Sequence, residues 1–246
     1  MKIAVFADVH ANLEALLAFF DHSKRQKINF FFFLGDIVGY GPNPDECVDV
    51  LRRMENLNAV MGNHDSAVLW KTSPYAMNTH ARDSILWTMD QLKKENIKFI
   101  QNLEQHIVYN GVCYCHSTPS NPESCTYLHS TSKALMAFLG SSYWLSFVSH
   151  THSPLVICKK KYLNICMDKV VGGEKVQLHK DRRWIINCGS VGQPRDGIAG
   201  GSYCIYDDIH RTVVFHRFSY DYEATATKIM DTGLPEYLGR RLKTGH

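Results

Sequence analysis

The sequence lacks an apolar run long enough to cross a membrane. Its longest runs, such as Ile28 to Leu34 with Asn29 inside it, are short, whereas a membrane-spanning helix needs about 20 apolar residues. The first ten residues hold one lysine and a short apolar run that meets Asp8 at once, which does not fit a secretory signal peptide. We therefore expect a cytoplasmic protein with no membrane partner.

A strong excess of charge is also missing. The formal net charge is +3 over 246 residues, which is too small to indicate a nucleic-acid or membrane surface. No basic stretch with interleaved aromatic residues predicts a nucleic-acid groove either. Hydrophobic residues make up 45% of the chain, as in ordinary globular proteins. Because we find no repeat, low-complexity tract or linker, we treat residues 1–246 as a single domain, and the sequence leaves a homo-oligomer open.

Paired cysteine spacings are absent as well. The eight cysteines form no CxxC pair and no regular framework, which argues against a disulfide scaffold and against a thiolate-based metal or redox protein. We interpret them as reduced, mostly buried thiols. The chain also has no GxSxG motif, so no side-chain nucleophile stands in a setting typical of covalent hydrolases.

The stretch FFFFLGDIVGYGPNP, residues 30–44, is the centre of what the chain does contain. Its aromatic run predicts a strand buried on both faces within a parallel sheet. Asp36 follows that strand, and the glycines and prolines after it predict a tight turn. KIAVFA and LNAVMG predict two further strands, with helices between them that begin after Asn12 and at Pro44. This alternation is typical of a parallel α/β fold.

The second half of the chain predicts more strands than helices. Residues 75–103 favour one or two helices, and Asn110-Gly111 predicts a hairpin turn between two strands. A helix at about 131–139 and a strand at 143–148 follow, then short strands over 154–218 and a final helix or two within 222–243. Lys159 to Lys161 predict a solvated hairpin tip.

Polar side chains with metal-binding atoms follow five of the predicted strands. They are Asp8 with His10, Asp36, Asn63 with His64, His116, and His150 with His152. In extended backbone the two pairs spaced i, i+2 would point the same way, toward one ion or toward two neighbouring ions. Carboxylate, amide and imidazole donors suit Mn, Fe or Zn better than a soft thiolate site does.

Five motifs that carry these residues resemble the calcineurin-like metallophosphoesterase family, most closely its small prokaryotic phosphodiesterases and phosphatases. In chain order they are ADVHAN, GDIVGYGPNPDEC, GNHD, CHSTP and SHTHSP, and INCGSVGQPRDG extends the resemblance to about residue 197. The resemblance implies an α/β fold, a four-layer αββα sandwich of two mixed sheets flanked by helices. Four positions depart from the usual family pattern: Ala7 for serine, Ser149 for glycine, Cys188 for proline, and His116 in CHST.

The resemblance also implies two divalent metal ions, with Mn expected and Fe, Zn or Ni as alternatives. One ion would bind Asp8, His10, Asp36 and His152, and the other Asp36, Asn63, His116 and His150, so that Asp36 bridges them. A hydroxide shared by the ions would attack phosphorus without a covalent enzyme intermediate. His64 would stabilise or protonate the leaving group, and Asp65 would orient the His64 imidazole.

The substrate is expected to be a small phosphorylated compound, and its class stays open. A phosphomonoester, a phosphodiester, a phosphoprotein or a dinucleoside polyphosphate would use the same core, and a non-catalytic interaction scaffold with this fold is a further alternative. Discrimination is expected from the loop after Gly39 and from residues 66–82 and 117–130. Asn12 either caps a helix only or also contacts the substrate phosphate. Arg195 either approaches the phosphate or pairs with Asp196 at the surface.

Overall fold

The first 60 residues alternate strands and helices in the predicted order. A computed structural model describes residues 1–160 and 164–246, and Lys161 of the predicted hairpin tip lies outside that part. The elements are β1 (Lys2–Phe6), α1 (Leu13–Lys24), β2 (Phe30–Phe33), α2 (Pro44–Arg52) and β3 (Leu57–Ala59). β1 pairs with β2 and β2 with β3, both parallel. Only the second half of β2 is fully buried, so the prediction of burial along the whole strand is wrong for Phe30 and Phe31.

The local signals explain where the first two helices begin. The side-chain oxygen of Asn12 accepts a hydrogen bond from the Ala15 amide at 3.0 Å, which satisfies one of the free donors at the start of α1. Pro44 is the first residue of α2, where its missing N–H costs no helical bond. One helix was not predicted from the sequence. It is α3 (Asn63–Val68), which begins at Asn63 and is too short to show a helical periodicity of apolar residues.

The remaining elements agree with the predicted sequence of helices and strands. They are the 3₁₀ helix η1 (Pro74–Ala76), α4 (Thr79–Gln91), α5 (Lys94–Gln101), β4 (His106–Tyr109), β5 (Val112–Cys115), α6 (Thr131–Leu139), β6 (Leu145–Val148), β7 (Leu155–Lys159), β8 (Ile165–Lys169), β9 (Lys175–Gln177), β10 (Arg183–Asn187), β11 (Gly201–Asp207), β12 (Thr212–Phe218), α7 (Tyr222–Asp231), α8 (Glu236–Arg240) and η3 (Arg241–Lys243). Asn110 and Gly111 form the turn between β4 and β5, and both have positive φ, 51° and 75°, as a type I′ turn requires.

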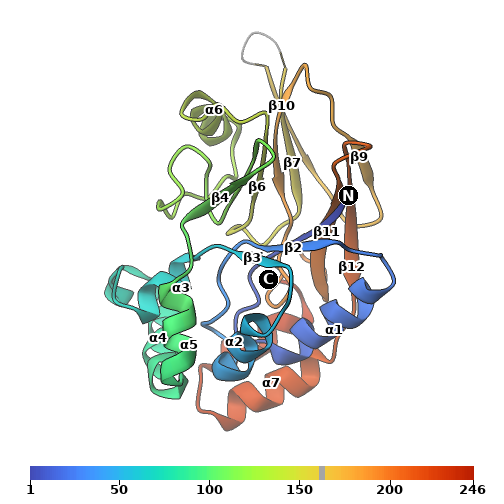
Figure 1. Ribbon diagram of the computed structural model, residues 1–246. Coiled ribbons are helices and arrows are strands. Elements are labelled where there is room, and N and C mark those ends of the chain that lie inside the picture. The colour runs from blue at the N-terminus through green and yellow to red at the C-terminus, as the bar shows by residue number, and fades with distance from the viewer. Residues whose placement is uncertain (161–163) are drawn as a thin grey trace.

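Two mixed sheets form the centre of the fold. Within residues 1–160 and 164–246 each sheet has six strands, in the orders β3-β2-β1-β11-β12-β9 and β4-β5-β6-β10-β7-β8. One apolar cluster joins the facing sides of the sheets, where the Phe32 and Tyr114 rings stack at 3.9 Å. Helices α1 and α2 pack on the outer side of the first sheet and α6 on the outer side of the second. Figure 1 shows α1, α2 and α7 at the bottom of the view and α6 at the upper left. This is the predicted αββα sandwich.

The cysteines agree with the expectation of reduced, mostly buried thiols. All eight cysteines are free thiols, and six of them are buried. None of the helices in the described part of the chain is both long and apolar enough to pass through a membrane.

The carboxyl ends of the parallel strands meet at one edge of the sandwich. The Asp8 amide after β1 donates to the Gly35 carbonyl after β2 at 3.0 Å, and the Ser149 amide after β6 donates to the His116 carbonyl after β5 at 2.9 Å. Open α/β sheets bind ligands at such strand ends. The residues that follow these strands are therefore the candidate site.

Candidate metal centre

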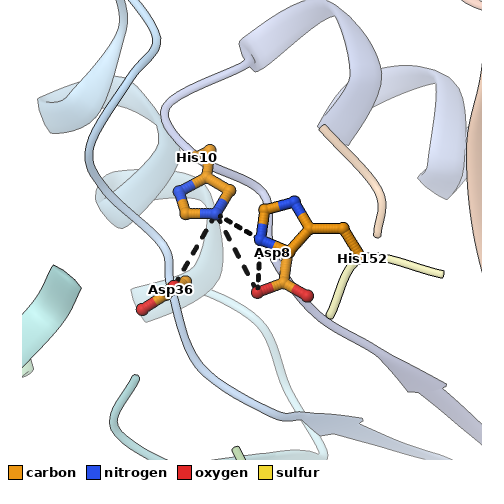
Figure 2. Close-up of side chains that lie close together, drawn as sticks. All are labelled: Asp8, His10, Asp36 and His152. Carbon is orange, nitrogen blue, oxygen red and sulfur yellow. Dashed lines mark hydrogen bonds and ion pairs between the residues drawn. The ribbon is translucent and has the colours of Figure 1, made fainter. Parts of the chain in front are cut away.

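The predicted ligands come together as two clusters that share one carboxylate. Asp8, His10, Asp36 and His152 present ligand atoms within 4.8 Å of one another, and Asp36, His116 and His150 do the same. Figure 2 shows the first cluster, with the His10 and His152 rings above the two carboxylates. The amide oxygen of Asn63 lies 3.1 Å from Nε2 of His116, beside the second cluster. None of the six clustered side chains is more than 3% exposed.

The backbone at these residues is not extended, contrary to the i, i+2 argument. Positive φ angles of 51° to 67° occur at Asp8, His10, Asp36, His150 and His152. This left-handed conformation is uncommon for residues other than glycine and is concentrated at functional sites. It ends each strand sharply and turns the side chains toward a common centre. As a result His152 lies in the first cluster and His150 in the second.

Backbone carbonyls determine which ring nitrogen of each histidine carries hydrogen. In every ring of the two clusters one nitrogen lies beside a carbonyl: His10 Nδ1 at 3.1 Å from Val38 O, His116 Nδ1 at 2.7 Å from Leu34 O, His152 Nδ1 at 2.6 Å from Gln193 O, and His150 Nε2 at 3.3 Å from Cys125 O. A carbonyl only accepts, so these nitrogens donate, and the other nitrogen of a neutral ring presents a lone pair.

The remaining ring nitrogens then face each other. Nε2 of His10 lies 3.2 Å from Nε2 of His152, and Nε2 of His116 lies 3.1 Å from Nδ1 of His150. Two lone pairs at such distances repel unless a cation or a proton lies between them. Second-layer carbonyls that orient imidazoles in this way are typical of metal sites.

The charges of the buried groups also fit bound cations. Oδ1 of Asp8 has no hydrogen-bond partner in the described part of the chain, and burial raises the pKa of Asp8 to about 7. Burial also raises the pKa of Asp36, but the imidazoles of His116 and His64 outweigh it and hold that pKa well below the usual value. Burying carboxylates without compensation is costly, and divalent cations would offset that cost. The oxygen and nitrogen donors suit Mn, Fe or Zn.

The imidazole pKa values keep most of the rings available as ligands. Burial lowers the pKa of His10 and of His152 well below the ordinary value and lowers that of His150 to about 3. Burial acts in the same direction on His116, but the Asp36 carboxylate outweighs it and raises the pKa of His116 to about 9. Neutral rings can donate lone pairs directly, whereas a bound cation would have to displace a proton from His116.

His64 lies beside the clusters without belonging to either. Its ring is 4.8 Å from the His10 ring and 4.5 Å from the Tyr40 ring, centroid to centroid. Nδ1 of His64 is buried without a hydrogen-bond partner among the described residues. It packs against Gly39, where a Cβ atom would overlap Nδ1. Only glycine therefore leaves room for the imidazole in this position.

The carboxylate of Asp65 makes no hydrogen bond to the His64 imidazole among the described residues, so the predicted orienting role has no contact in the structure to support it. Its oxygens accept from four buried amides instead: Asp36 N at 2.8 Å, Ile37 N at 2.9 Å, Gly62 N at 3.0 Å and Val38 N at 3.4 Å. Asp65 is the third residue of α3, where an acidic side chain satisfies free helical donors. It thereby fastens the loop that carries Asp36 to the start of α3.

The geometry favours one of the two interpretations for Asn12 and for Arg195. The Asn12 amide is used within the protein, because its oxygen accepts from Ala15 and its Nδ2 donates to Gly192 O at 2.8 Å. Capping therefore accounts for Asn12. Asp196 pairs with Arg217, so the predicted pair with Arg195 is wrong. The Arg195 guanidinium lies 5.6 Å from the Tyr40 ring centroid, and its Nε is buried without a partner in the described residues.

Three further residues lie at the site without having been predicted there. The Ser149 hydroxyl donates to Oδ2 of Asp8, and the departure from the family glycine was the available signal. The Tyr127 ring stacks on His150 at 4.0 Å. Arg241 donates to Oε1 of Gln193 at 3.3 Å, the same oxygen that accepts from Arg195 at 2.7 Å. No local pattern connects Arg241, far along the chain, with this site.

Comparisons with known proteins agree with the geometry. A family model described as a calcineurin-like phosphoesterase superfamily domain matches residues 1–209. An uncharacterized protein of Methanocaldococcus jannaschii is 40% identical over 247 aligned positions, covering 99% of this chain and 98% of the relative. The crystal structure of a metallophosphoesterase from Sphaerobacter thermophilus is 36% identical with a TM-score of 0.89, covering 100% and 99% of the two chains. A hypothetical protein from Pyrococcus horikoshii OT3 shares the fold, at 19% identity and a TM-score of 0.76 over 100% and 98%.

Proposed function

The chain belongs to the calcineurin-like phosphoesterase superfamily, and from this premise we propose that it hydrolyses a small phosphoric ester with the help of two divalent metal ions. The observation that carries the proposal is the pair of facing imidazole nitrogens in each cluster, next to the buried carboxylates of Asp8 and Asp36 in the first cluster and of Asp36 in the second. Such an arrangement is stabilised by cations and lies at the strand ends where this fold class binds ligands.

We assign the ligands by cluster. One ion would be held by Asp8, His10, Asp36 and His152, and the other by Asp36, Asn63, His116 and His150, with Mn expected and Fe, Zn or Ni as alternatives. When bound, the two ions would supply Lewis acidity at phosphorus and lower the pKa of water toward neutrality. Asp36 suits the bridging position because its two oxygens can serve one ion each and its charge offsets part of their repulsion.

Water is the proposed nucleophile, because two bound metal ions would activate it directly, and the hydroxyl in contact with the first cluster is poorly placed to attack a substrate. The Ser149 hydroxyl, which contacts the first cluster, is 1% exposed and already donates to Asp8. A nucleophilic serine needs an adjacent base and access to the substrate. Direct transfer of the phosphoryl group to water, without a covalent enzyme intermediate, is the mechanism that fits.

His64 is the residue we assign to the leaving group. It is not a member of either cluster, yet its ring lies next to His10. Burial lowers its pKa to about 4, so the free protein holds a neutral imidazole with one N–H. Donation of a hydrogen bond from that N–H would stabilise negative charge on the departing oxygen. Arg195 is proposed to contact the phosphoryl oxygens, with Arg241 held beside it through Gln193.

The test is hydrolysis of p-nitrophenyl phosphate and bis-p-nitrophenyl phosphate by protein loaded with Mn²⁺. Activity should disappear in chelator and return with the metal. His64→Ala should lower kcat by about 10²- to 10⁴-fold, the usual contribution of a positioned acid or base, and the variant should keep two ions per chain. His106→Ala, on an exposed residue of β4, is the matched control. Absence of turnover of any phosphate ester by the loaded protein would favour a non-catalytic scaffold.

A further inference from the structure

Two cavities next to the second cluster share Asn63 as a lining residue. The first, which we call the polar cavity, has a volume of about 310 Å³ and is lined by Asn63, Lys71, Gln105, His116 and Glu123 among others. The second, the aromatic cavity, has a volume of about 240 Å³ and is lined by Tyr40, Asn63, His64, Tyr127 and His150 among others. Because Asn63, Thr72 and Cys125 line both, the cavities meet at Asn63, one of the proposed metal ligands.

The aromatic cavity is suited to a planar or apolar group. The Tyr127 ring stacks on His150 at 4.0 Å, and the Tyr40 ring lies 4.5 Å from His64. Met77 and Ala81 complete an apolar wall. His64, which we assign to the leaving group, faces this cavity and does not line the polar one. The departing alcohol therefore belongs here, and stacking on tyrosine favours an aromatic one.

The polar cavity is suited to an uncharged group with hydroxyls. Lys71 and Glu123 bring opposite charges to it, so a further phosphate would meet a carboxylate as well as an ammonium group. The Lys71 ammonium and the Gln105 amide both donate to the sulfur of Met61, at 3.9 Å and 3.6 Å. A thioether is a weak acceptor, so both donors would form stronger hydrogen bonds with oxygen acceptors on a ligand.

We propose that the substrate is a phosphodiester, with its phosphorus at the paired clusters, a planar leaving alcohol in the aromatic cavity and a sugar-like group in the polar cavity. This inference rests on the proposed function. Each cavity is near or below the roughly 300 Å³ at which small-molecule sites begin, so each accommodates one substituent. A phosphomonoester would leave one cavity empty.

The chemistry balances with water as the only co-reactant. The water oxygen bonds to phosphorus, the bond from phosphorus to the oxygen in the aromatic cavity breaks, and the departing alcohol takes up the proton. The product is a phosphomonoester whose substituent stays in the polar cavity. Binding of that product therefore reports on the polar cavity without any turnover.

The kinetic test compares two esters with the same leaving group. We would measure kcat/KM for p-nitrophenyl phosphate and for thymidine 5′-phosphate p-nitrophenyl ester with Mn²⁺-loaded protein. The diester should be preferred by at least about 10-fold. Gln105→Ala should reduce the diester-to-monoester ratio by about 5- to 10-fold, as the loss of one hydrogen bond predicts. Gln101→Ala, on an exposed residue of α5, should leave the ratio unchanged.

The binding test uses thymidine 5′-phosphate and inorganic phosphate in isothermal titration calorimetry. Gln105→Ala and Lys71→Ala should each weaken binding of the nucleotide relative to phosphate by about 5-fold or more, and thermal unfolding would verify that both variants fold. Equal kcat/KM values for the two esters, or an unchanged nucleotide-to-phosphate ratio in both variants, would overturn the phosphodiester inference and leave the proposed function standing. Absence of turnover of either ester would overturn the proposed function, and this inference with it.

Discussion

Replacement of Asp65 by asparagine should destabilise the fold and weaken metal binding together. The carboxylate is fully buried, with Asp36 N and Gly62 N on one oxygen and Ile37 N and Val38 N on the other. Asparagine has a single oxygen, and its NH₂ group cannot accept. Whichever way the amide turns, two backbone donors lose their acceptor and face another donor. The loop that carries Asp36 should therefore loosen.

The expected magnitude follows from those two lost bonds. A hydrogen bond to a charged group contributes about 1.5–3 kcal/mol, so two lost bonds cost about 3–6 kcal/mol. The substitution also removes a charge that is buried next to Asp36. Burial and Asp36 both raise the pKa of Asp65, so removal of this unfavourable charge offsets part of the stability lost with the two hydrogen bonds. We expect a net loss of about 3 kcal/mol in the free energy of unfolding. We also expect Mn²⁺ affinity to fall by about 10- to 100-fold, as for other groups that orient metal ligands.

Urea unfolding in chelator would measure the stability term, since bound metal would otherwise add its own stabilisation. Asp83→Asn, at a half-exposed ion pair with Arg82, should change the free energy of unfolding by less than about 0.5 kcal/mol. A loss below about 1 kcal/mol for Asp65→Asn would refute the anchoring role. Lower kcat with unchanged stability and metal content would restore the hypothesis that Asp65 orients His64.

Four further predictions follow from single contacts. Asp36→Asn should leave fewer than two ions per chain in elemental analysis, because Asp36 is the carboxylate common to the clusters; two retained ions would contradict the bridging role. Gly39→Ala should lower kcat at least about 10-fold at constant metal content, since the new Cβ would overlap Nδ1 of His64 at a φ of +86°; kinetics like those of the wild type would show that the ring position does not matter. Ser149→Gly should weaken Mn²⁺ binding by about 10-fold in calorimetry, because the hydroxyl that donates to Asp8 is lost; equal affinity would assign Ser149 to packing alone. Burial raises the pKa of Asp45, but it is outweighed by the Lys93 ammonium 2.7 Å from Oδ2 and by hydrogen bonds from Lys93 N at 2.8 Å and Asn96 Nδ2 at 2.7 Å, which together lower that pKa. Its stabilisation should be present above the unfolded value of about 3.9 and be lost as pH falls through the lowered folded value. Asp45→Asn should therefore lower the free energy of unfolding by about 1–3 kcal/mol at pH 7, and by progressively less below pH 4, as measured by urea unfolding. A difference between the two proteins that stays the same as pH falls would show that the charge of Asp45 does not provide the stabilisation.

The local elements of this chain follow from sequence because each depends on neighbouring residues. Asn12 caps α1 through an amide three residues away, and Asn110-Gly111 makes its turn through its own backbone angles. The position of the candidate ligands also follows, since parallel strands carry their carboxyl ends to one edge. Asp36 and His116 follow strands of different sheets, yet their side chains lie 3.4 Å apart. The role of these residues as metal ligands stays a prediction.

Contacts between distant segments could not be derived in the same way. Strand β11 pairs antiparallel with β1 across about 200 residues of chain, and no local pattern encodes that pairing. The left-handed backbone at Asp8 and His150 is imposed by the bonds of the surrounding loops, because these residue types alone favour other conformations. For the same reason the sequence pairs Asp65 with its neighbour His64, whereas in the structure Asp65 accepts from amides nearly 30 residues away.

The sequence by itself determined which chemical groups stand at the strand ends, because strand periodicity and turn residues are local properties of the chain. Only the tertiary structure decided how those groups face one another, which rings donate to which carbonyls, and that two cavities meet at Asn63. These features depend on side-chain packing between segments from five strands and the loops between them. Distances and free volumes of that kind exist only once the two sheets have packed together.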